Sequence, residues 1–149
     1  NFLNYIDYKR VYVLKGAYSM KKSVNGKVPK VISGTLPASE TAQTPGMIRK
    51  PAIHKGSTGA SKIWFGTVTC APNYKGPPHH HGEAETAAYV VSGYVRVYYG
   101  EDFKDSVEAG PGDYLFVPAN TWHIEENPYD IPCEQFLTRG PDNIVINME

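Results

Sequence analysis

The sequence predicts an all-β protein, either an antiparallel sandwich or a barrel, on three observations. The 149-residue chain contains 14 Gly and 12 Pro residues, and both residue types favour tight turns. It also contains 11 Tyr and many Val residues, which favour strands. Short apolar runs alternate with Gly, Pro or Asn, and no amphipathic helix competes with them. The length suits one domain with a sizeable core.

The first 60 residues show little regular pattern. "KRVYVL" (residues 9–14) predicts a short strand, and Asn25-Gly26 predicts a turn. Residues 34–59 are rich in Ser, Thr, Pro, Gly and Ala, which indicates irregular structure with a helical turn near Ser39–Ala42. We therefore expect residues 1–60 to form an N-terminal arm that precedes a regular domain at 61–149.

Strands follow one another closely in the second half of the chain. We expect strands at 61–70, on both sides of a hairpin turn at Ser92-Gly93 within 87–100, on both sides of a Gly-Pro-Gly turn up to 117, and at 121–126, 133–139 and 143–147. The even spacing of these segments favours antiparallel pairing in a sandwich or barrel.

Charge and hydropathy exclude several classes of partner. Fifteen Lys and Arg residues balance fifteen Asp and Glu residues without a basic block, which argues against nucleic acid. No apolar run approaches the roughly 20 residues of a membrane span. No secretory signal is visible, although the sequence begins at Asn1, so we expect a cytoplasmic protein. We expect Cys70 and Cys133 to be reduced and buried, because neither belongs to a CxxC motif.

The segment "GPPHHHGEAET" (residues 76–86) concentrates potential metal ligands. It holds three of the five histidines of the chain. Because side chains alternate along a strand, His79 and His81 share one face and His80 takes the other. Glu83 and Glu85 have the same parity as His79 if the strand stays extended. Two imidazoles and a carboxylate form a workable metal set, and a solvated polar loop is the alternative.

A second segment, "GDYLFVPANTWHIEEN" (residues 112–127), supports the metal-site interpretation of the histidine pair. Together the two segments resemble the motifs of the cupin family. In the second motif Gly112, Pro118, His123 and Asn127 match. Asn120 stands where Gly is usual, and Asn tolerates a positive φ better than most residues.

The first motif matches at His79 and His81 but leaves its carboxylate open. Glu85 follows His81 after three residues, as in the family, whereas counting back from Gly93 places Thr86 at the carboxylate position. Glu83 or a water molecule could also complete the site.

The resemblance implies a double-stranded β-helix barrel with a metal inside it. The implied ligands are His79, His81, Glu85 and His123. They suit one divalent ion, namely Fe, Mn, Ni, Co or Zn. The implied function is a metal-dependent enzyme, an oxygenase first (a dioxygenase-type oxidoreductase), that acts on a small oxygenated organic molecule. A non-redox isomerase, decarboxylase or lyase and a non-catalytic ligand- or metal-binding cupin are the alternatives. The resemblance also implies a homodimer, in which the N-terminal arm supplies strands that pack on the barrel or are exchanged between subunits.

Overall fold

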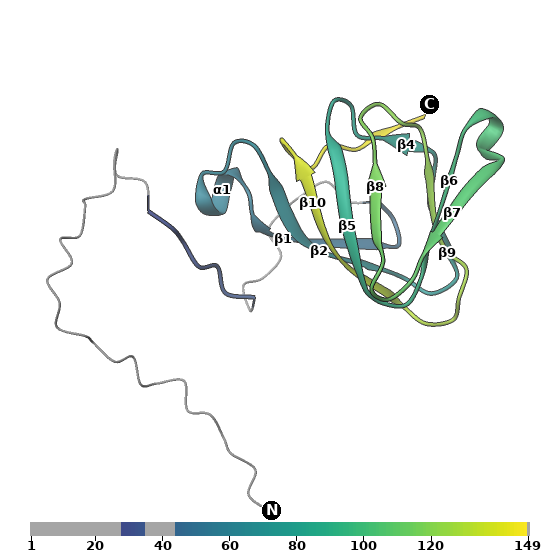
Figure 1. Ribbon diagram of the computed structural model, residues 1–149, viewed down its shortest axis with the longest axis horizontal. Coiled ribbons are helices and arrows are strands. Elements are labelled where there is room, and N and C mark those ends of the chain that lie inside the picture. The colour runs from purple at the N-terminus through teal and green to yellow at the C-terminus, as the bar shows by residue number, and fades with distance from the viewer. Residues whose placement is uncertain (1–27, 35–43, 149) are drawn as a thin grey trace, which may run out of the picture.

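A computed structural model describes residues 28–34 and 44–148, and two sheets face each other in it (Figure 1). The larger sheet has the strand order β1 (Met47–Ile53), β2 (Trp64–Cys70), β10 (Cys133–Gly140), β5 (Glu85–Ser92) and β8 (Tyr114–Val117). The second sheet has the order β3 (Tyr74–Lys75), β9 (Ile124–Asn127), β6 (Val95–Tyr99) and β7 (Asp105–Ala109). All recorded strand pairs are antiparallel, so the predicted all-β barrel is confirmed.

Three short elements complete the described part of the chain. Strand β4 (His79–His80) pairs with β11 (Ile146–Asn147), which brings the C-terminal segment beside the histidine run. Helix α1 (Lys55–Thr58) follows β1 at the outside of the barrel, as Figure 1 shows. A 3₁₀ turn, η2 (Glu101–Phe103), lies between β6 and β7. The strand predicted at 9–14, the turn at 25–26 and the helical turn at 39–42 lie outside the described residues.

The prediction of irregular structure throughout residues 34–59 is wrong for its second part. Strand β1 pairs along its length with β2, and it alternates a buried Met47 and Arg49 with exposed neighbours. The segment contains Pro51, which disguises it as a loop. Pro is tolerated here because β1 is at the edge of the sheet, where the register also shifts between Pro51 and Ile53.

The predicted hairpin at Ser92-Gly93 is also wrong. Strands β5 and β6 flank this turn, but β5 pairs with β10 and β8, whereas β6 pairs with β7 and β9. The chain crosses from one sheet to the other at Gly93, whose φ is +70°. A Cβ atom there would lie 2.4 Å from the carbonyl oxygen of Pro132, so the crossing requires glycine.

The inward faces of the two sheets form the core. Its buried apolar members are Met47, Trp64, Val68, Cys70, Ala88, Val90, Val95, Val97, Ala109, Cys133 and Leu137. Strand β10 shows the alternation clearly, because Cys133, Gln135, Leu137 and Arg139 are buried and the residues between them are more exposed. The same inward alternation that fills the core therefore also delivers polar side chains to the interior. No helix in the described residues has the length and apolar character to cross a membrane.

Candidate metal centre

The two histidine segments are joined through their backbones. The amide of His79 donates to the carbonyl of His123 at 3.0 Å, and the amide of His123 donates to the carbonyl of His79 at 2.9 Å. Directly opposed residues of an antiparallel pair project to the same side. The pairing therefore places one histidine of each motif side by side, although 44 positions separate them in the sequence.

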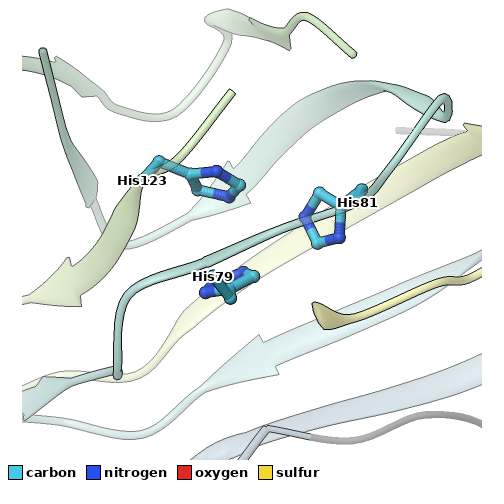
Figure 2. A group of neighbouring side chains, drawn as sticks. All are labelled: His79, His81 and His123. Atoms are coloured by element: carbon cyan, nitrogen blue, oxygen red, sulfur yellow. The ribbon is translucent and has the colours of Figure 1, made fainter. Parts of the chain in front are cut away.

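Three buried imidazoles converge at this point, as Figure 2 shows. The rings of His79 and His123 have centroids 4.4 Å apart, and each lies 5.0 Å from the ring of His81. One nitrogen from each ring lies within 4.8 Å of the others, which is close enough for the three to hold one ion. The structure thus brings together three of the four residues that the sequence analysis named as ligands.

The hydrogen bonds of the rings identify the nitrogen that is free to bind a metal. In each case Nδ1 contacts a backbone carbonyl: Pro77 for His79 at 3.0 Å, Ile144 for His81 at 2.5 Å and Thr121 for His123 at 2.8 Å. A carbonyl only accepts, so Nδ1 carries the proton and Nε2 keeps its lone pair. All three Nε2 atoms are buried without a hydrogen-bond partner. This fits a metal site, in which the outer nitrogen of each ligand is held by a carbonyl or carboxylate.

Burial also favours the neutral form, which a metal requires, in His79 and His81. It lowers the pKa of His79 below its ordinary value. Burial, and after it the positive charge of Arg139, lowers the pKa of His81 to about 3. Neutral imidazole is therefore present at physiological pH without competition from protons.

His80 behaves as its parity predicts. It is only partly buried, and its ring packs on Trp122 with centroids 4.3 Å apart instead of joining the cluster. Its Nδ1 accepts a hydrogen bond from the amide of Gly82 at 3.3 Å.

Glu85 is not brought to the three histidines. The predicted ligand role of Glu85 requires the strand to continue beyond His81, but a turn interrupts the strand at Gly82, where φ is +56°. The amide of Ala84 donates back to the carbonyl of His81, and β5 then begins with Glu85 exposed and Thr86 buried. Glu83 is exposed too, and it accepts a hydrogen bond from Asn120 Nδ2 at 2.8 Å. Because of this turn, the carboxylates of Glu83 and Glu85 are exposed and do not face the barrel interior.

A different carboxylate lies beside the histidines. Glu125 is buried, and its Oε2 is 3.6 Å from Nε2 of His79 and 4.0 Å from the guanidinium of Arg49. Burial would raise the pKa of Glu125, but neighbouring imidazole and guanidinium groups offset this and lower it to about 2. Glu125 is not among the ligands expected from the sequence. The available signal was its position two residues after His123, which places both side chains on the same face of an extended strand.

The turn residues of the second motif have the roles that the pattern predicts. Asn120 adopts a φ of +55°, which confirms that Asn replaces Gly at a left-handed position. Asn127 is fully buried and donates through Nδ2 to the carbonyls of Ala71 and Ile131. It therefore fixes the loop after β9 and does not face the histidines as a ligand.

An apolar pocket opens next to His123. Its volume is about 260 Å³, and its walls include Val97, Tyr99, Leu115, Val117 and Thr121. The pocket lies between β6 and β7 of one sheet and β8 of the other, so it reaches the histidines from the gap between the two sheets.

Comparison with known proteins agrees with this geometry. The cupin domain model matches residues 66–138, a range that contains both histidine segments. The chain belongs to the cupin superfamily. Among curated proteins, none matches it in sequence.

Solved structures show the same cupin fold at low sequence identity. The polyketide cyclase RemF from Streptomyces resistomycificus is 22% identical with a TM-score of 0.66, covering 82% of this chain and 86% of that chain. A Klebsiella pneumoniae protein with a double-stranded β-helix domain is 15% identical with a TM-score of 0.58, covering 73% and 90%. An oxalate oxidase is 17% identical with a TM-score of 0.60, covering 78% and 62%.

Proposed function

We propose that this cupin is a metal-dependent enzyme that acts on a small oxygenated organic molecule. The observation that carries the proposal is the convergence of three buried Nε2 atoms. None has a hydrogen-bond partner, and the Nδ1 atom of each ring contacts a backbone carbonyl. A bound divalent ion would polarise a carbonyl or stabilise an enolate of the substrate. The suitable ions are divalent Fe, Mn, Ni, Co and Zn, because imidazole nitrogen binds divalent ions of the first transition row.

The residues around the histidines define what the protein itself contributes. Three neutral imidazoles leave the positive charge of an ion undiminished, and Glu125 lies at the side of His79 to balance part of it. The walls of the pocket beside His123 are mostly apolar and offer a substrate few polar partners. The interior thus combines a site for a cation with an adjacent apolar pocket.

Our first proposal for the reaction class is an oxygenase. The apolar pocket beside His123 suits both an organic substrate and apolar dioxygen. The second candidate is a non-redox isomerase, decarboxylase or lyase. The fold similarity to a polyketide cyclase supports this second class, because that protein shares the barrel over most of both chains.

Two measurements test the proposal. Protein purified without a nickel column should contain about one transition-metal ion per chain by elemental analysis. Turnover of enediol, catechol or ketone substrates should then consume dioxygen and stop under nitrogen. Turnover that continues under nitrogen would select the non-redox class. Tight ligand binding without any product would select a non-catalytic binding protein, and metal-free protein would refute the proposed function.

We also propose that the protein is a homodimer, formed through the outer face of the five-stranded sheet. Large apolar side chains gather on this face: Ile48, Tyr89, Val91, Tyr114, Phe116 and Phe136. Tyr114 is 83% exposed, and contiguous exposed apolar surface is typical of interaction sites. Phe116→Glu should give a monomer by light scattering at micromolar concentration, whereas Ile131→Glu, at an exposed loop position, should remain a dimer.

A cytoplasmic location is proposed on the state of the cysteines. Cys70 and Cys133 are both buried. They lie directly opposite each other on the paired strands β2 and β10, yet they form no disulfide. Reduced thiols are usual in the cytoplasm. Cell fractionation with an antibody against the protein tests this proposal.

A further inference from the structure

The interior of the barrel carries an unbalanced positive charge. Among the described residues, the buried charged side chains besides the histidines are Arg49, Arg139 and Glu125. Glu125 lies 4.0 Å from Arg49, so one carboxylate faces one guanidinium. The charge of Arg139 is left over, and arginine does not lose its proton at physiological pH. A divalent ion at the histidines would increase this excess.

Arg139 lies close to the same site. It is 1% exposed, and its guanidinium donates to Asn143, the chain neighbour of Ile144, whose carbonyl bonds Nδ1 of His81. Its Nε donates to Thr86 Oγ1 at 2.7 Å, and its Nη1 donates to Asn143 Oδ1. Thr86 is the register partner of Arg139 on β5, which fixes the stem of the side chain. These contacts orient the guanidinium firmly.

One donor of this guanidinium has no partner. Nη2 of Arg139 is buried and makes no hydrogen bond within the described residues. An unpaired buried donor on a charged group is costly, and a positioning role toward Thr86 and Asn143 uses only the other two nitrogens. A guanidinium fits oxyanions, because its planar donors match the two oxygens of a carboxylate. The feature that would satisfy Nη2 is therefore an anionic oxygen.

The apolar pocket supplies the second half of the recognition site. It borders His123, whereas Arg139 is connected to His81 through the contacts of Asn143 and Ile144, and the rings of these two histidines are 5.0 Å apart. The pocket has a volume of about 260 Å³, and its walls offer few polar partners. An apolar body there would gain from burial of its surface.

We propose that the substrate is a small apolar molecule with one anionic oxygen group, whose oxyanion lies between the three histidines and Arg139 and whose body occupies the pocket beside His123. This rests on the proposed metal-dependent function and adds the substrate class to it. Small aromatic or alicyclic carboxylates, enolates and phenolates belong to this class. Sugars and neutral polar molecules do not.

Three probes separate the two halves of this site. Benzoate carries both an anionic head and an apolar body, acetate carries the head alone, and benzyl alcohol carries the body without the charge. Calorimetric titration of the unsubstituted protein should give an affinity for benzoate about 10-fold or more above that for either of the others. Equal affinities for benzoate and benzyl alcohol would overturn the proposal without any variant.

Variants then assign each half to residues. Arg139→Gln should weaken benzoate binding about 10- to 100-fold and leave benzyl alcohol within about twofold, since a charge-assisted hydrogen bond is lost. Arg96→Gln is the matched control, because it removes the same charge from an exposed pair with Glu108 and should change neither affinity. Val107→Trp, at an exposed position in the pocket wall, should weaken benzoate but not acetate.

The outcomes distinguish this inference from the proposed function. Metal content is measured on the same samples, before and after treatment with a chelator. Metal retained together with benzoate binding that ignores Arg139→Gln in a folded protein would overturn the inference alone. Absence of metal together with Arg139-dependent benzoate binding would refute the metal function and support the anion site. If Arg139→Gln does not fold, Arg139→Lys replaces it: lysine has no second nitrogen to stand in for Nη2 while it bonds Thr86 or Asn143, so unchanged benzoate affinity in it would overturn the inference.

Discussion

The two ends of strand β10 face the same interior but are built for different purposes. At one end Cys133 lies opposite Cys70, both fully buried, and burial first of all raises the pKa values of these thiols to about 11 and about 12. At the other end Arg139 lies beside Thr86 and contacts Asn143, the chain neighbour of the Ile144 that bonds His81. The thiols stay neutral and simply fill space, whereas the guanidinium keeps its charge and an unpaired donor.

This difference shows which end of the barrel is less stable without a ligand. An unsatisfied buried polar atom costs about 1–3 kcal/mol; three such Nε2 atoms lie together in the candidate metal centre, and Nη2 of Arg139 is a further one in the same interior. Such a concentration is destabilising unless a ligand satisfies it. The apolar end therefore supports the fold, and the polar end is where a bound group stabilises it.

The largest expected effect is the loss of bound metal when one of the three histidines is replaced. His79→Ala, His81→Ala and His123→Ala should each purify largely without metal, because each removes one of three convergent ligands. The loss should exceed the roughly 10–100-fold that an outer partner contributes. Elemental analysis checks this, with His80→Ala as the control that keeps its metal. Full metal loading in His123→Ala would contradict the site.

The metal-free protein should lose stability as the pH falls. His79 and His81 have pKa values below the ordinary 6.5, so the unfolded chain binds protons that the folded chain does not. Their contribution is complete above about pH 6.5 and decreases toward about pH 3, by up to about 1.4 kcal/mol per pH unit for each group. Glu125 adds to the loss between its ordinary 4.5 and about 2.

Urea unfolding of chelator-treated protein at pH 7, 6 and 5 measures this dependence. His81→Ala should flatten it between pH 6 and 5, and His80→Ala should leave it unchanged. Equal urea midpoints at pH 7 and pH 5 in the unsubstituted protein would show that the imidazoles are not held neutral by burial.

The two carboxylates should differ in their effect on the metal. Glu125→Gln removes the charge beside His79 and should weaken metal affinity about 10–100-fold, the usual effect of losing an outer partner. Glu85→Gln changes an exposed side chain and should have no effect. Competition with a coloured chelator measures both affinities. The reverse order would restore Glu85 as the carboxylate of the site.

A substitution at the apolar end should produce the opposite pattern. Val90→Ala removes two fully buried methyl groups and should lower the free energy of unfolding by about 2 kcal/mol. Its metal content per folded chain should stay normal. Urea unfolding and elemental analysis on one sample measure both, and loss of metal would show that the two ends are not independent.

The smallest expected effect concerns the turn that supports His123. Asn120→Ala should cost about 1 kcal/mol, because alanine tolerates a φ of +55° poorly and cannot reach Glu83. Asn120→Gly keeps the backbone freedom and should cost less. Thermal unfolding ranks the two variants, and the opposite ranking would show that the side-chain contact matters more than the backbone.

Local sequence signals predicted the strands and the histidines well, since both depend on near neighbours. Turn residues marked most strand ends, and a two-residue period placed His79 and His81 together. The pairing of strands that are distant in sequence could not be predicted from local patterns. The crossing at Gly93 looks like a hairpin in sequence, and Pro51 hides an edge strand. Arg139 joins the site only because β10 pairs with β5, which no local pattern shows. The turn at Gly82 changed the direction of Glu85 for the same reason, because its shape depends on contacts such as Asn120 with Gly82.

The dependence of His81 on Ile144 has a consequence for the order of events during synthesis. The carbonyl of Ile144 fixes the proton on Nδ1 of His81, and β11 then pairs with β4 beside His79. A ribosome makes residues 79 to 81 well before residue 144. The nascent chain therefore cannot present three oriented imidazoles until its C-terminal segment has emerged and docked. We expect any metal binding at this centre to follow translation, and a chain truncated before residue 144 to lack the carbonyl that orients His81.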